Sequence, residues 1–476
     1  MNHQVISNDG PRYINQTLQF IDGEFVAAFK RDSLFLYPLL IAAFAKAGLD
    51  PVLTGELISA ISSVLVLCPL YLLFKRIGTP TSAFWSCLVF AVMPVFNKFS
   101  VTVMRDPFFL FVVAWLVYLL WYAFERLYPV CFLLCSFLTM LLMTIRLEGI
   151  LFLPIGLLLL LVTLVRSPAE RIRTLTCAGF YLAPLLLILV AAGWYFAASA
   201  GESFRAAQVG NFVSGVAERG IFFHHPAVDA SLDAAQAVTG PMPENDFVQI
   251  VRENVAIIYL IGMLRLLIAN IWWPFFLVGM IGLVCSVEKK WGRTFLAVTI
   301  FTYLLMAYLH NLHLNFLDER YLYIPTMFFC FWIGLGVECL VEMAGSLTRK
   351  RVVCGVVSVL LIFSAVQSVK AMTPKEGLSS MEAGQWLAAQ PSLQGLSLLA
   401  NGEKIPFYGG RGDDFIRAEF ARDFRREVSL HQPELISIET RLKNIAAVST
   451  FDGYDLLIRF DDEKYGALIF RKTLKD

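Results

Sequence analysis

Charged residues are scarce in this chain, and neither sign dominates. Lys, Arg, Asp and Glu make up 16% of the 476 residues, and 39 basic residues against 38 acidic ones leave a net charge of +1. A nucleic-acid-binding protein carries a basic surface, so this balance argues against a nucleic-acid partner. Hydrophobic residues make up 57% of the sequence, and the mean hydropathy is +0.65. A soluble core does not need so much apolar sequence, and the composition predicts a multi-pass membrane protein.

Cysteine is absent from every polar stretch of the sequence. All nine cysteines lie within apolar runs, at positions 68, 87, 131, 135, 177, 285, 330, 339 and 354. This pattern argues against a disulfide framework and against a thiolate metal site. We expect ordinary buried thiols that pack as small hydrophobes. Internal repeats and low-complexity stretches are also lacking.

Apolar runs long enough to span a membrane recur through most of the chain. Crossing about 30 Å of hydrocarbon takes about 20 residues of helix. The run from 128 to 165 is twice that length and is interrupted only by Arg146 and Glu148, which predicts two helices that turn at this polar pair. Ten spans are predicted in all: 53–74, 80–97, 107–125, 128–145, 148–165, 175–199, 264–287, 293–310, 321–343 and 352–370.

The loops between these spans differ in charge, and the difference predicts their sides. Alternate loops carry an excess of Lys and Arg, which is typical of the cytoplasmic side. The basic loops contain Lys75/Arg76, Arg126, Arg166/Arg171/Arg173, Lys289/Lys290/Arg293 and Arg349/Lys350/Arg351. The opposite side receives Asp9, Asp32, Arg105–Asp106, Arg146–Glu148, residues 200–252 and residues 310–320. Acids paired with arginines are therefore expected at the outer mouth of the bundle.

Three regions follow from this pattern. Residues 1–52 are expected to form a first outer loop with interfacial helices, because the apolar stretch 34–47 is too short to span comfortably. Residues 53–372 are expected to form the transmembrane bundle, including a large outer loop at 200–262, and residues 373–476 a soluble α/β domain on the outer face. The predicted fold class is an all-α bundle of about ten transmembrane helices with a small C-terminal α/β domain.

The C-terminal region alternates helix and strand patterns. Two helices are predicted, Met381–Ala389 and Glu434–Asn444. Four strands are predicted, Leu396–Ala400, Ile445–Ser449, Tyr454–Phe460 and Ala467–Arg471. The polar turn at Asp461–Lys464 is expected to join the last two strands as a hairpin.

The sequence does not show how the N-terminal residues would cross the membrane. Residues 1–33 are polar and fall outside by the charge rule, yet neither a span nor a signal-peptide pattern precedes them. We expect that the natural protein starts upstream, with a basic cytoplasmic end and one more span of about 20 apolar residues.

Several ionisable residues near the membrane boundary admit two interpretations. Asp106 precedes Pro107 at the start of a span and is either a helix cap or a functional acid. Arg146 and Glu148 form either a structural ion pair or, as we favour, a phosphate-facing group. Arg320 at a helix start is either an interfacial anchor or a lipid-phosphate contact.

Two further motifs carry weaker signals. Asp9 stands before Gly10-Pro11, a common turn signal, and beside the other acids of the outer mouth. His310 and His313 have a spacing that places two imidazoles on one helical face. Two histidines without nearby carboxylates are weak evidence for a metal site, so ordinary interfacial histidines are favoured.

Taken in order along the chain, these residues resemble the C-type integral-membrane glycosyltransferases. The resemblance is to family-39-like bacterial enzymes, which are related to protein O-mannosyltransferases and to the lipid A aminoarabinose transferase. It covers roughly residues 5–345, and the ordered set is more specific than any single motif. The matching segments are Asp9 to Tyr13, Tyr37-Pro38-Leu39-Leu40, Asp106-Pro107, Arg146-Leu147-Glu148-Gly149, and Glu319-Arg320-Tyr321 with Pro325.

The resemblance implies a glycosyltransferase that uses a polyprenyl-phosphate-linked sugar and faces the periplasm from the bacterial inner membrane. A lipid phosphate departs with a negative charge that arginines stabilise, and the acceptor hydroxyl needs a carboxylate base. Single displacement would invert the anomeric centre. The implied roles are Asp9 as base, Asp106 in positioning the acceptor or a metal, Arg146, Arg320 and Tyr321 at the donor phosphate, and Asp32, Arg105, Glu148, Glu319 and His310 in support.

The resemblance leaves other points open. The acceptor is a lipid, a glycan or a protein, and some relatives use a divalent cation, although the sequence identifies no definite ligand set or certain cofactor. The competing hypothesis is a transporter or flippase of lipid-linked sugars. Such a protein should have inverted repeats and helices broken by Gly or Pro near the midplane, and the sequence gives no clear sign of either.

Overall fold

The structure is a computed structural model that describes residues 5–198, 226–239, 247–285, 291–373, 377–412, 414–418, 424–448 and 450–473. These residues are mostly helical, and a five-stranded sheet forms near the C-terminus. The chain divides into two units. The first contains Met1–Ala60, Phe99–Arg105 and Ala371–Asp476, and the second contains Ile61–Lys98 and Asp106–Lys370.

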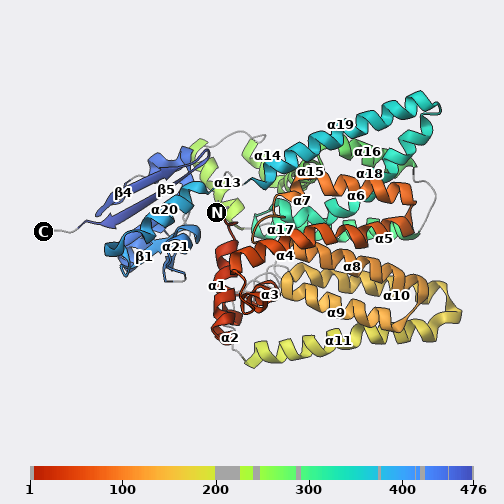
Figure 1. Ribbon diagram of the computed structural model, residues 1–476, viewed down its shortest axis with the longest axis horizontal. Coiled ribbons are helices and arrows are strands. Elements are labelled where there is room, and N and C mark those ends of the chain that lie inside the picture. The colour runs from red at the N-terminus through yellow and green to blue at the C-terminus, as the bar shows by residue number, and fades with distance from the viewer. Residues whose placement is uncertain are drawn as a thin grey trace. The chain divides into compact units, whose positions relative to one another are not determined.

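The second unit is built from apolar helices, several of which run side by side (Figure 1). Helix α18 packs against both α6 and α16, and it is buried along most of its length. The helices of this unit are α5 Leu67–Ile77, α6 Pro80–Val92, α7 Pro94–Asn97, α8 Asp106–Arg126, α9 Pro129–Ile145, α10 Phe152–Arg166, α11 Arg171–Ala198, α13 Pro226–Thr239, α14 Phe247–Glu253, α15 Val255–Ile271, α16 Trp273–Cys285, α17 Trp291–Leu314 and α18 Tyr323–Met343. Three 3-10 helices belong to it as well, η1 Leu147–Leu151, η2 Pro168–Glu170 and η3 Glu319–Leu322, while α4 Pro51–Leu65 and α19 Leu347–Met372 continue into the first unit.

The protein is a multi-pass membrane protein. By length and composition, six helical segments of the described chain can cross a membrane, or seven if one bent pair counts as a single span. The six are Pro51–Ile77, Asp106–Arg126, Leu147–Arg166, Trp291–Leu314, Glu319–Met343 and Leu347–Met372. Helices α6 and α9 are apolar but shorter. The described parts of the ten predicted spans are mostly helical, two of them with a break, and the predicted turn between α9 and α10 is confirmed at Arg146–Glu148.

Close contact between helices in the second unit depends on small residues. A Cβ atom on Gly282 of α16 would lie 2.0 Å from the Trp332 carbonyl oxygen of α18. A Cβ on Gly336 of α18 would lie 2.0 Å from the Val278 carbonyl oxygen, so the two helices approach each other through paired glycines. Backbones that come this close gain van der Waals contact, which drives helix association in lipid.

The predicted straight span 264–287 is wrong in its geometry. Helix α15 ends at Ile271, Trp272 adopts a positive φ of 66°, and α16 begins at Trp273, with 98° between the two helices. Pro274 at the start of α16 lacks the N–H that a continuous helix would use. The predicted span 80–97 is likewise interrupted, because α6 ends at Val92 and α7 begins at Pro94.

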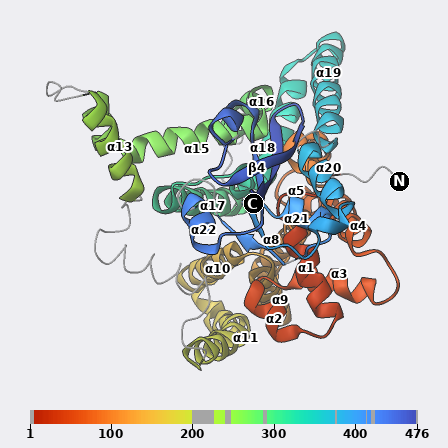
Figure 2. The same ribbon diagram turned by 90° about the vertical axis from the view of Figure 1, so that its left-hand side faces the viewer.

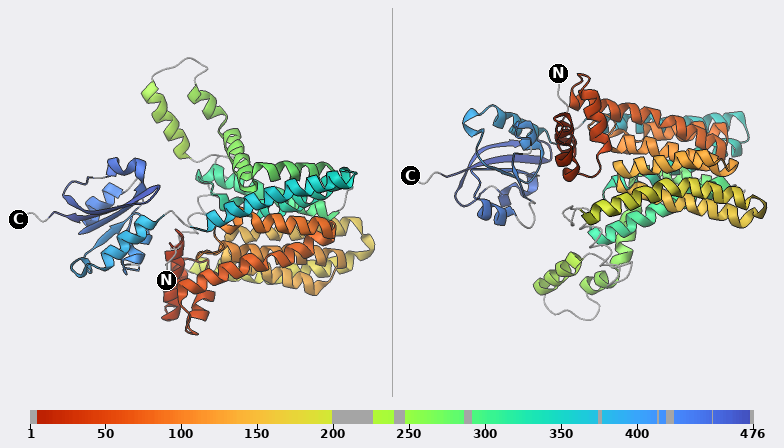
Figure 3. Two further views of the ribbon diagram at one scale, coloured as in Figure 1. Left: turned by 45° about the horizontal axis from the view of Figure 1, so that its top comes forward. Right: turned by 90° about the horizontal axis from the view of Figure 1, so that it is seen from below.

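Only part of the predicted outer loop 200–262 is described, because residues 200–225 and 240–246 lie outside the described residues, as do Lys289 and Lys290. The described parts form α13, α14 and the start of α15. Both views of Figure 3 show the light-green helices projecting from the packed helices of their unit. Arg252 of α14 contacts Asp233 of α13 at 2.5 Å, which ties the two helices together.

The first unit begins with three short helices, α1 Gly10–Ile21, α2 Phe25–Arg31 and α3 Leu36–Ala45. Helix α3 lies within the predicted apolar stretch 34–47 and packs against α1. Phe20, Ala28 and Ala42 form a small shared core. These helices thereby give the first loop a fixed shape around Asp9 and Asp32.

The C-terminal region of the first unit is an α/β fold with strand order β2-β1-β3-β5-β4. Strand β1 pairs in parallel with β2 and β3, and β5 pairs antiparallel with β3 and β4. Figure 2 shows α20 and α21 beside this sheet. The elements are α20 Leu378–Ala388, η4 Pro391–Leu393, β1 Leu398–Ala400, α21 Lys404–Tyr408, β2 Ile416–Arg417, α22 Phe424–His431, β3 Leu435–Arg441, η5 Leu442–Val448, β4 Tyr454–Asp461 and β5 Tyr465–Lys472.

Alternate residues of the central strands supply the two faces of this sheet. Leu435 of β3 packs with Ala383 and Leu387 of α20, whereas Ile436 packs with Phe424 of α22. Ile438 follows Ile436 onto the same face, as the two-residue period of a strand requires. Each face thereby obtains its own helix-covered core.

Two predictions for this region are wrong. Glu434–Asn444 was expected to be helical, but most of it is the central strand β3, which is bonded on both edges. Ile445–Ser449 was expected to be a strand, but residues up to Val448 belong to the 3-10 helix η5, and Ser449 lies outside the described residues. The helix Met381–Ala389, the remaining three strands and the hairpin are confirmed with small shifts of their ends.

Asp462 in the hairpin turn joins that turn to the start of α20. Its carboxylate accepts hydrogen bonds from the backbone N–H of Gly377 at 2.9 Å and from the Ser379 hydroxyl at 3.0 Å. It also accepts from the N–H groups of Lys464 and Tyr465, both within the turn. Partial burial opposes ionisation, but these donors together lower the pKa of Asp462 below the usual aspartate value.

We expect Asp462→Asn to destabilise the C-terminal sheet by about 1–3 kcal/mol, the scale for hydrogen bonds to a charged group. Because its pKa is lowered in the folded state, Asp462 stabilises the fold above the ordinary aspartate pKa, and that stability is lost as the pH falls. Hydrogen exchange of β4 and β5 in the full chain should therefore accelerate at neutral pH. Asp455→Asn, on an exposed position of β4, serves as the control and should exchange like the parent.

Candidate functional site

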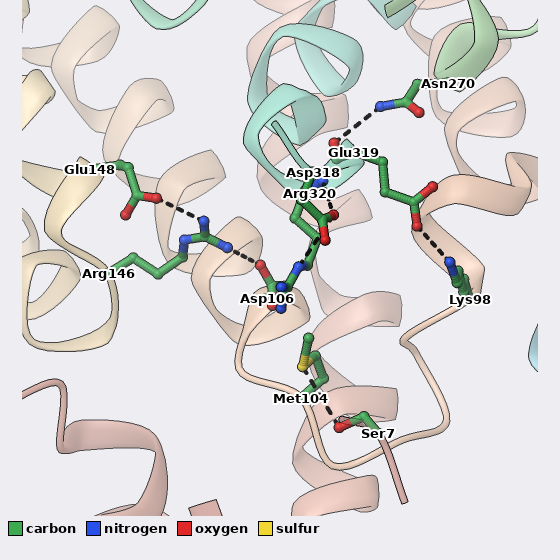
Figure 4. Close-up of polar contacts among 10 residues, drawn as sticks. All are labelled: Ser7, Lys98, Met104, Asp106, Arg146, Glu148, Asn270, Asp318, Glu319 and Arg320. Atoms are coloured by element: carbon green, nitrogen blue, oxygen red, sulfur yellow. Dashed lines mark hydrogen bonds and ion pairs between the residues drawn. The ribbon is translucent and has the colours of Figure 1, made fainter. Parts of the chain in front are cut away.

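A buried arginine forms the centre of the polar network in the second unit. Arg146 follows α9 in an extended conformation, with φ −148° and ψ 137°, which turns its side chain away from the helix path. Its guanidinium donates to the carboxylate of Asp106 and, at 2.7 Å, to that of Glu148 (Figure 4). Arg146 is 7% exposed and Asp106 2%. Such a pair is stable inside a helical bundle only because opposite charges meet there.

The network lies in a narrow recess with aromatic walls. Its enclosed volume is about 10 Å³, enough for roughly one water molecule, and about 300 Å³ when the open space at its mouth is included. The Tyr303 hydroxyl donates to the backbone carbonyl of Glu148 at 2.9 Å and so fixes the turn from which Arg146 projects. The lining residues are Asp106, Phe109, Leu110, Arg146, Glu148, Tyr303, Met306, Arg320, Tyr321, Tyr323 and Ile324.

Asp106 acts in this structure as an ion-pair partner. One carboxylate oxygen pairs with Arg146, whereas the other, Oδ2, is buried without a hydrogen-bond partner among the described residues. The sequence left a choice between a helix cap and a functional acid, and the contact with Arg146 accounts for the burial of this carboxylate. An unsatisfied buried carboxylate oxygen costs free energy unless a ligand or water donates to it.

The second arginine of the recess is more accessible. The Arg320 side chain is 22% exposed and lies 3.4 Å from the carboxylate of Asp318, which also caps the Arg320 N–H at 3.0 Å. The ring of Tyr321 lies 5.5 Å from the Arg146 guanidinium and 4.3 Å from the ring of His310. His310, Tyr321 and both arginines thus belong to one cluster, as the sequence predicted for this side of the bundle.

Glu319 points to a different part of the second unit. Its carboxylate pairs with Lys98 at 2.7 Å, and its backbone carbonyl accepts from the Asn270 amide at 3.1 Å (Figure 4). Asn270 lies at the end of α15, two residues before the bend at Trp272. Lys98 and Asn270 were not singled out in the sequence, because a lone lysine in a loop and an asparagine in an apolar span carry no motif.

The remaining predicted site residues belong to the first unit and form a group of their own. Asp32 is 4% exposed, lies 3.2 Å from Arg12 and 3.9 Å from Arg105, and accepts a hydrogen bond from the Leu34 N–H at 3.0 Å. The Arg105 guanidinium lies 5.4 Å from the ring centre of Tyr13. Asp32 therefore joins the first loop to the segment before Asp106, and its supporting role in the site stays a prediction.

Asp9 stands at the N-cap position of α1, but its side chain makes no capping hydrogen bond there. It lines a separate polar pocket in the first unit together with residues of the C-terminal sheet. The sequence could not reveal this proximity, because nearly 400 residues separate Asp9 from those partners.

A metal ion does not fit the residues brought together here. In the described part of the chain, no group of three or more His, Cys, Asp or Glu side chains is arranged to hold one. The two carboxylates of the recess, Asp106 and Glu148, both already face Arg146. The ligand set of the possible divalent cation therefore stays undefined.

Comparison with solved structures identifies the fold. The chain superimposes on ArnT from Cupriavidus metallidurans with a TM-score of 0.55 and on the same protein bound to undecaprenyl phosphate with 0.56, at 12% identity, covering 98% of this chain and 94% of that one. AglB from Archaeoglobus fulgidus, in complex with an inhibitory peptide and a dolichol-phosphate, matches with a TM-score of 0.55 at 12% identity, covering 93% of this chain and 66% of that one. No protein-family model and no curated protein sequence matches the chain. The structural resemblance to C-type membrane glycosyltransferases, predicted from the ordered motifs, is confirmed at the level of the fold.

The two arginines of the recess should differ sharply in their effect on stability. Arg146→Met removes the cation from the buried carboxylate of Asp106 and from the partly exposed carboxylate of Glu148, and it is expected to destabilise the protein by about 3–5 kcal/mol. Arg320→Met removes a partly exposed pair, so about 0–1 kcal/mol is expected. Thermal unfolding of both variants in detergent tests this difference.

A charge-balanced variant provides the control. Adding Asp106→Asn to Arg146→Met removes the buried carboxylate that has lost its cation, so it should recover part of the lost stability. Equal unfolding temperatures for Arg146→Met and the parent would show that Arg146 is not the ion that this network requires.

Proposed function

We propose that this protein is a glycosyltransferase that moves a sugar from a polyprenyl-phosphate donor to an acceptor outside the cytoplasm. The carrying observation is the fold match over nearly the whole chain to a protein whose structure contains undecaprenyl phosphate, combined with an arginine-containing recess in the second unit. A dolichol-phosphate in the AglB structure supports the same substrate class. The acceptor is a lipid, a glycan or a protein.

Arg320 is the proposed phosphate contact and Arg146 its electrostatic support. The Arg146 guanidinium is already engaged with the carboxylates of Asp106 and Glu148, so its proposed part is to support the phosphate site from behind rather than to contact the phosphate. The Arg320 guanidinium lies 3.4 Å from the partly exposed carboxylate of Asp318, and its own side chain is 22% exposed, so phosphate oxygens can reach it. Tyr321 lies beside Arg146 and has a hydroxyl that can donate to the same phosphate.

The proposed reaction is a single displacement. The acceptor oxygen attacks the anomeric carbon, the carbon–oxygen bond to the lipid phosphate breaks, and the phosphate leaves with the bonding electron pair. Arginine stabilises the charge that develops on this leaving group. Asp9 is the proposed base that takes the proton from the acceptor hydroxyl, and the configuration at the anomeric carbon inverts.

A flippase or transporter of lipid-linked sugars is the second candidate. The observation in its favour is the break between α15 and α16, where two apolar helices meet at 98°. Broken helices of this kind line substrate sites in transporters. A transporter would move the intact lipid-linked sugar between leaflets and would form no new glycosidic bond, which separates the two hypotheses experimentally.

The proposed orientation places the C-terminal sheet domain outside the cytoplasm, with the bacterial periplasm as its compartment. The alternation of basic loops supports this arrangement, and ten spans result if the bent pair α15–α16 counts as one span and α6, α9 and α11 also cross the membrane. A reporter enzyme that is active only outside the cytoplasm, fused after Lys370, should be active. A cytoplasm-only reporter that is active at the same junction would reverse the orientation.

Purified protein with a synthetic polyprenyl-phosphate sugar and membrane glycolipid extract tests the function directly. Asp9→Asn should lower kcat by about 100- to 10,000-fold, the usual contribution of a general base. Arg320→Met should instead raise the KM for the donor by about 10- to 150-fold, because a charged hydrogen bond contributes about 1.5–3 kcal/mol.

The matched control for Asp9 is Asp50→Asn, another aspartate at a helix start of the first unit that does not line the polar pocket. It should transfer at the parent rate. Movement of labelled donor between leaflets without any glycosylated product would favour the transporter.

A further inference from the structure

The first unit contains a polar pocket that the proposed donor chemistry does not use. It has a volume of about 360 Å³, within the usual size of small-ligand sites. The start of α1 and the C-terminal sheet domain both contribute to its wall. Its charged lining residues are Asp9, Arg12, Glu403, Lys404, Arg417 and Glu439.

The charged groups of this pocket are held in place by the fold. Glu439 projects from the central strand β3, and its carboxylate accepts a hydrogen bond from the Ile405 N–H at 3.3 Å. Asn401 bonds both the N–H and the carbonyl of Glu439, each at 2.8 Å, and so fixes the backbone beneath the carboxylate. Burial raises the pKa of Glu439, although Lys404 opposes the shift.

Two glycines provide the space for these groups. A Cβ on Gly402 would lie 2.7 Å from a carboxylate oxygen of Glu439. A Cβ on Gly377, which has a φ of +91°, would lie 2.5 Å from the Lys404 ammonium. Lys404 is only 7% exposed, which is rare for lysine unless it is paired. The pocket is therefore a formed site rather than a gap between surface side chains.

One acceptor in the pocket is left unsatisfied. The Oε1 atom of Glu403 accepts from Arg417 at 2.6 Å, whereas Oε2 is buried without a hydrogen-bond partner among the described residues. A buried acceptor of this kind is expected to meet a donor from a ligand or from water. A ligand hydroxyl supplies such a donor.

The balance of charge defines the chemistry of the ligand. Three acids and three bases line the pocket, so it favours neither a polyanion nor a polycation. Amide groups of Asn8 and Asn401 and the hydroxyl of Ser380 add further donors and acceptors. Hydroxyl groups both donate and accept, which matches this wall, whereas a lipid tail would leave its charges unsolvated.

The segment that carries Asp9 is anchored to the C-terminal sheet domain. The Ile6 N–H donates to the Tyr408 hydroxyl of α21 at 2.8 Å, three residues before Asp9. The neighbouring Ser7 hydroxyl donates to the Val103 carbonyl at 2.7 Å. The proposed base and the sheet residues thereby share one pocket.

From this arrangement we propose that the pocket of the first unit binds a hydroxyl-rich carbohydrate group, and that this group is the acceptor. The acceptor assignment rests on the proposed function; the carbohydrate site does not. Glu403 and Arg417 bind hydroxyls of the sugar, Lys404 and Glu439 form the floor, and Asp9 faces the hydroxyl to be glycosylated. The C-terminal domain is then the acceptor-binding domain.

Saturation-transfer NMR on the purified full chain tests binding with three soluble probes: chitobiose, lactose and glucosamine. At least one should bind the parent, and Glu403→Gln and Arg417→Met should each weaken that binding at least tenfold. Glu427→Gln is the matched control, because Glu427 lies on α22 of the same domain and pairs with His431 at 3.1 Å, away from the pocket lining. It should bind like the parent. Hydrogen exchange of β3 verifies that each variant is folded.

Failure to detect any of the three sugars, or equal binding by all variants, overturns the carbohydrate site. Binding of inorganic phosphate that displaces the sugar would also overturn it, because the pocket would then be an anion site. The transfer assay is read separately. If sugar binding depends on Glu403 but no transfer occurs, the carbohydrate site is supported and the proposed glycosyltransferase activity is wrong. If Glu403→Gln transfers sugar at the parent rate, the glycosyltransferase activity is supported and this pocket is not its acceptor site.

Discussion

The buried charge of Arg146 is the constraint on which the second unit depends. An apolar helix, α9, ends in a cation that cannot remain unpaired inside the bundle, so two other segments must bring carboxylates to it. Asp106 is the first residue of α8, and Glu148 lies in η1. The turn between α9 and α10 therefore has a defined geometry, which Tyr303 of α17 reinforces from a fourth segment. These fixed segments form the walls of the recess, which Arg320 and Tyr321 also line.

This dependence explains why the sequence predicted much of the recess. A polar pair that interrupts a run of twice the spanning length has few explanations besides a turn, and Arg146 with Glu148 forms that turn. Hairpin residues such as Asp462 are similarly informative, because a turn signal acts locally. Each of these features depends on neighbours in the chain, which the sequence displays directly.

The wrong and missing predictions concern features whose structure depends on residues far away in the sequence. Glu434–Asn444 contains helix-forming residues, but strands β1 and β5 form hydrogen bonds to the two edges of β3. Ile436 and Ile438, two residues apart, both point into the same hydrophobic core, as in a strand. The bend at Trp272 separates two apolar helices that composition alone joins into one span. Lys98, Asn270 and the C-terminal partners of Asp9 are ordinary residues in the sequence, and only the fold brings them to their sites.

The two polar sites differ in a way that suits the two substrates of a transfer reaction. In the second unit, aromatic side chains line the recess together with Arg146 and Arg320. In the first unit, equal numbers of acids and bases line a larger pocket that apolar groups would not fill favourably. A lipid phosphate needs cations next to an apolar path, whereas a hydroxylated acceptor needs donors and acceptors in balance. A single lipid-linked sugar carries both a phosphate and hydroxyl groups, so a transporter could use both kinds of site as well, and the formation of a new glycosidic bond is what separates transfer from transport.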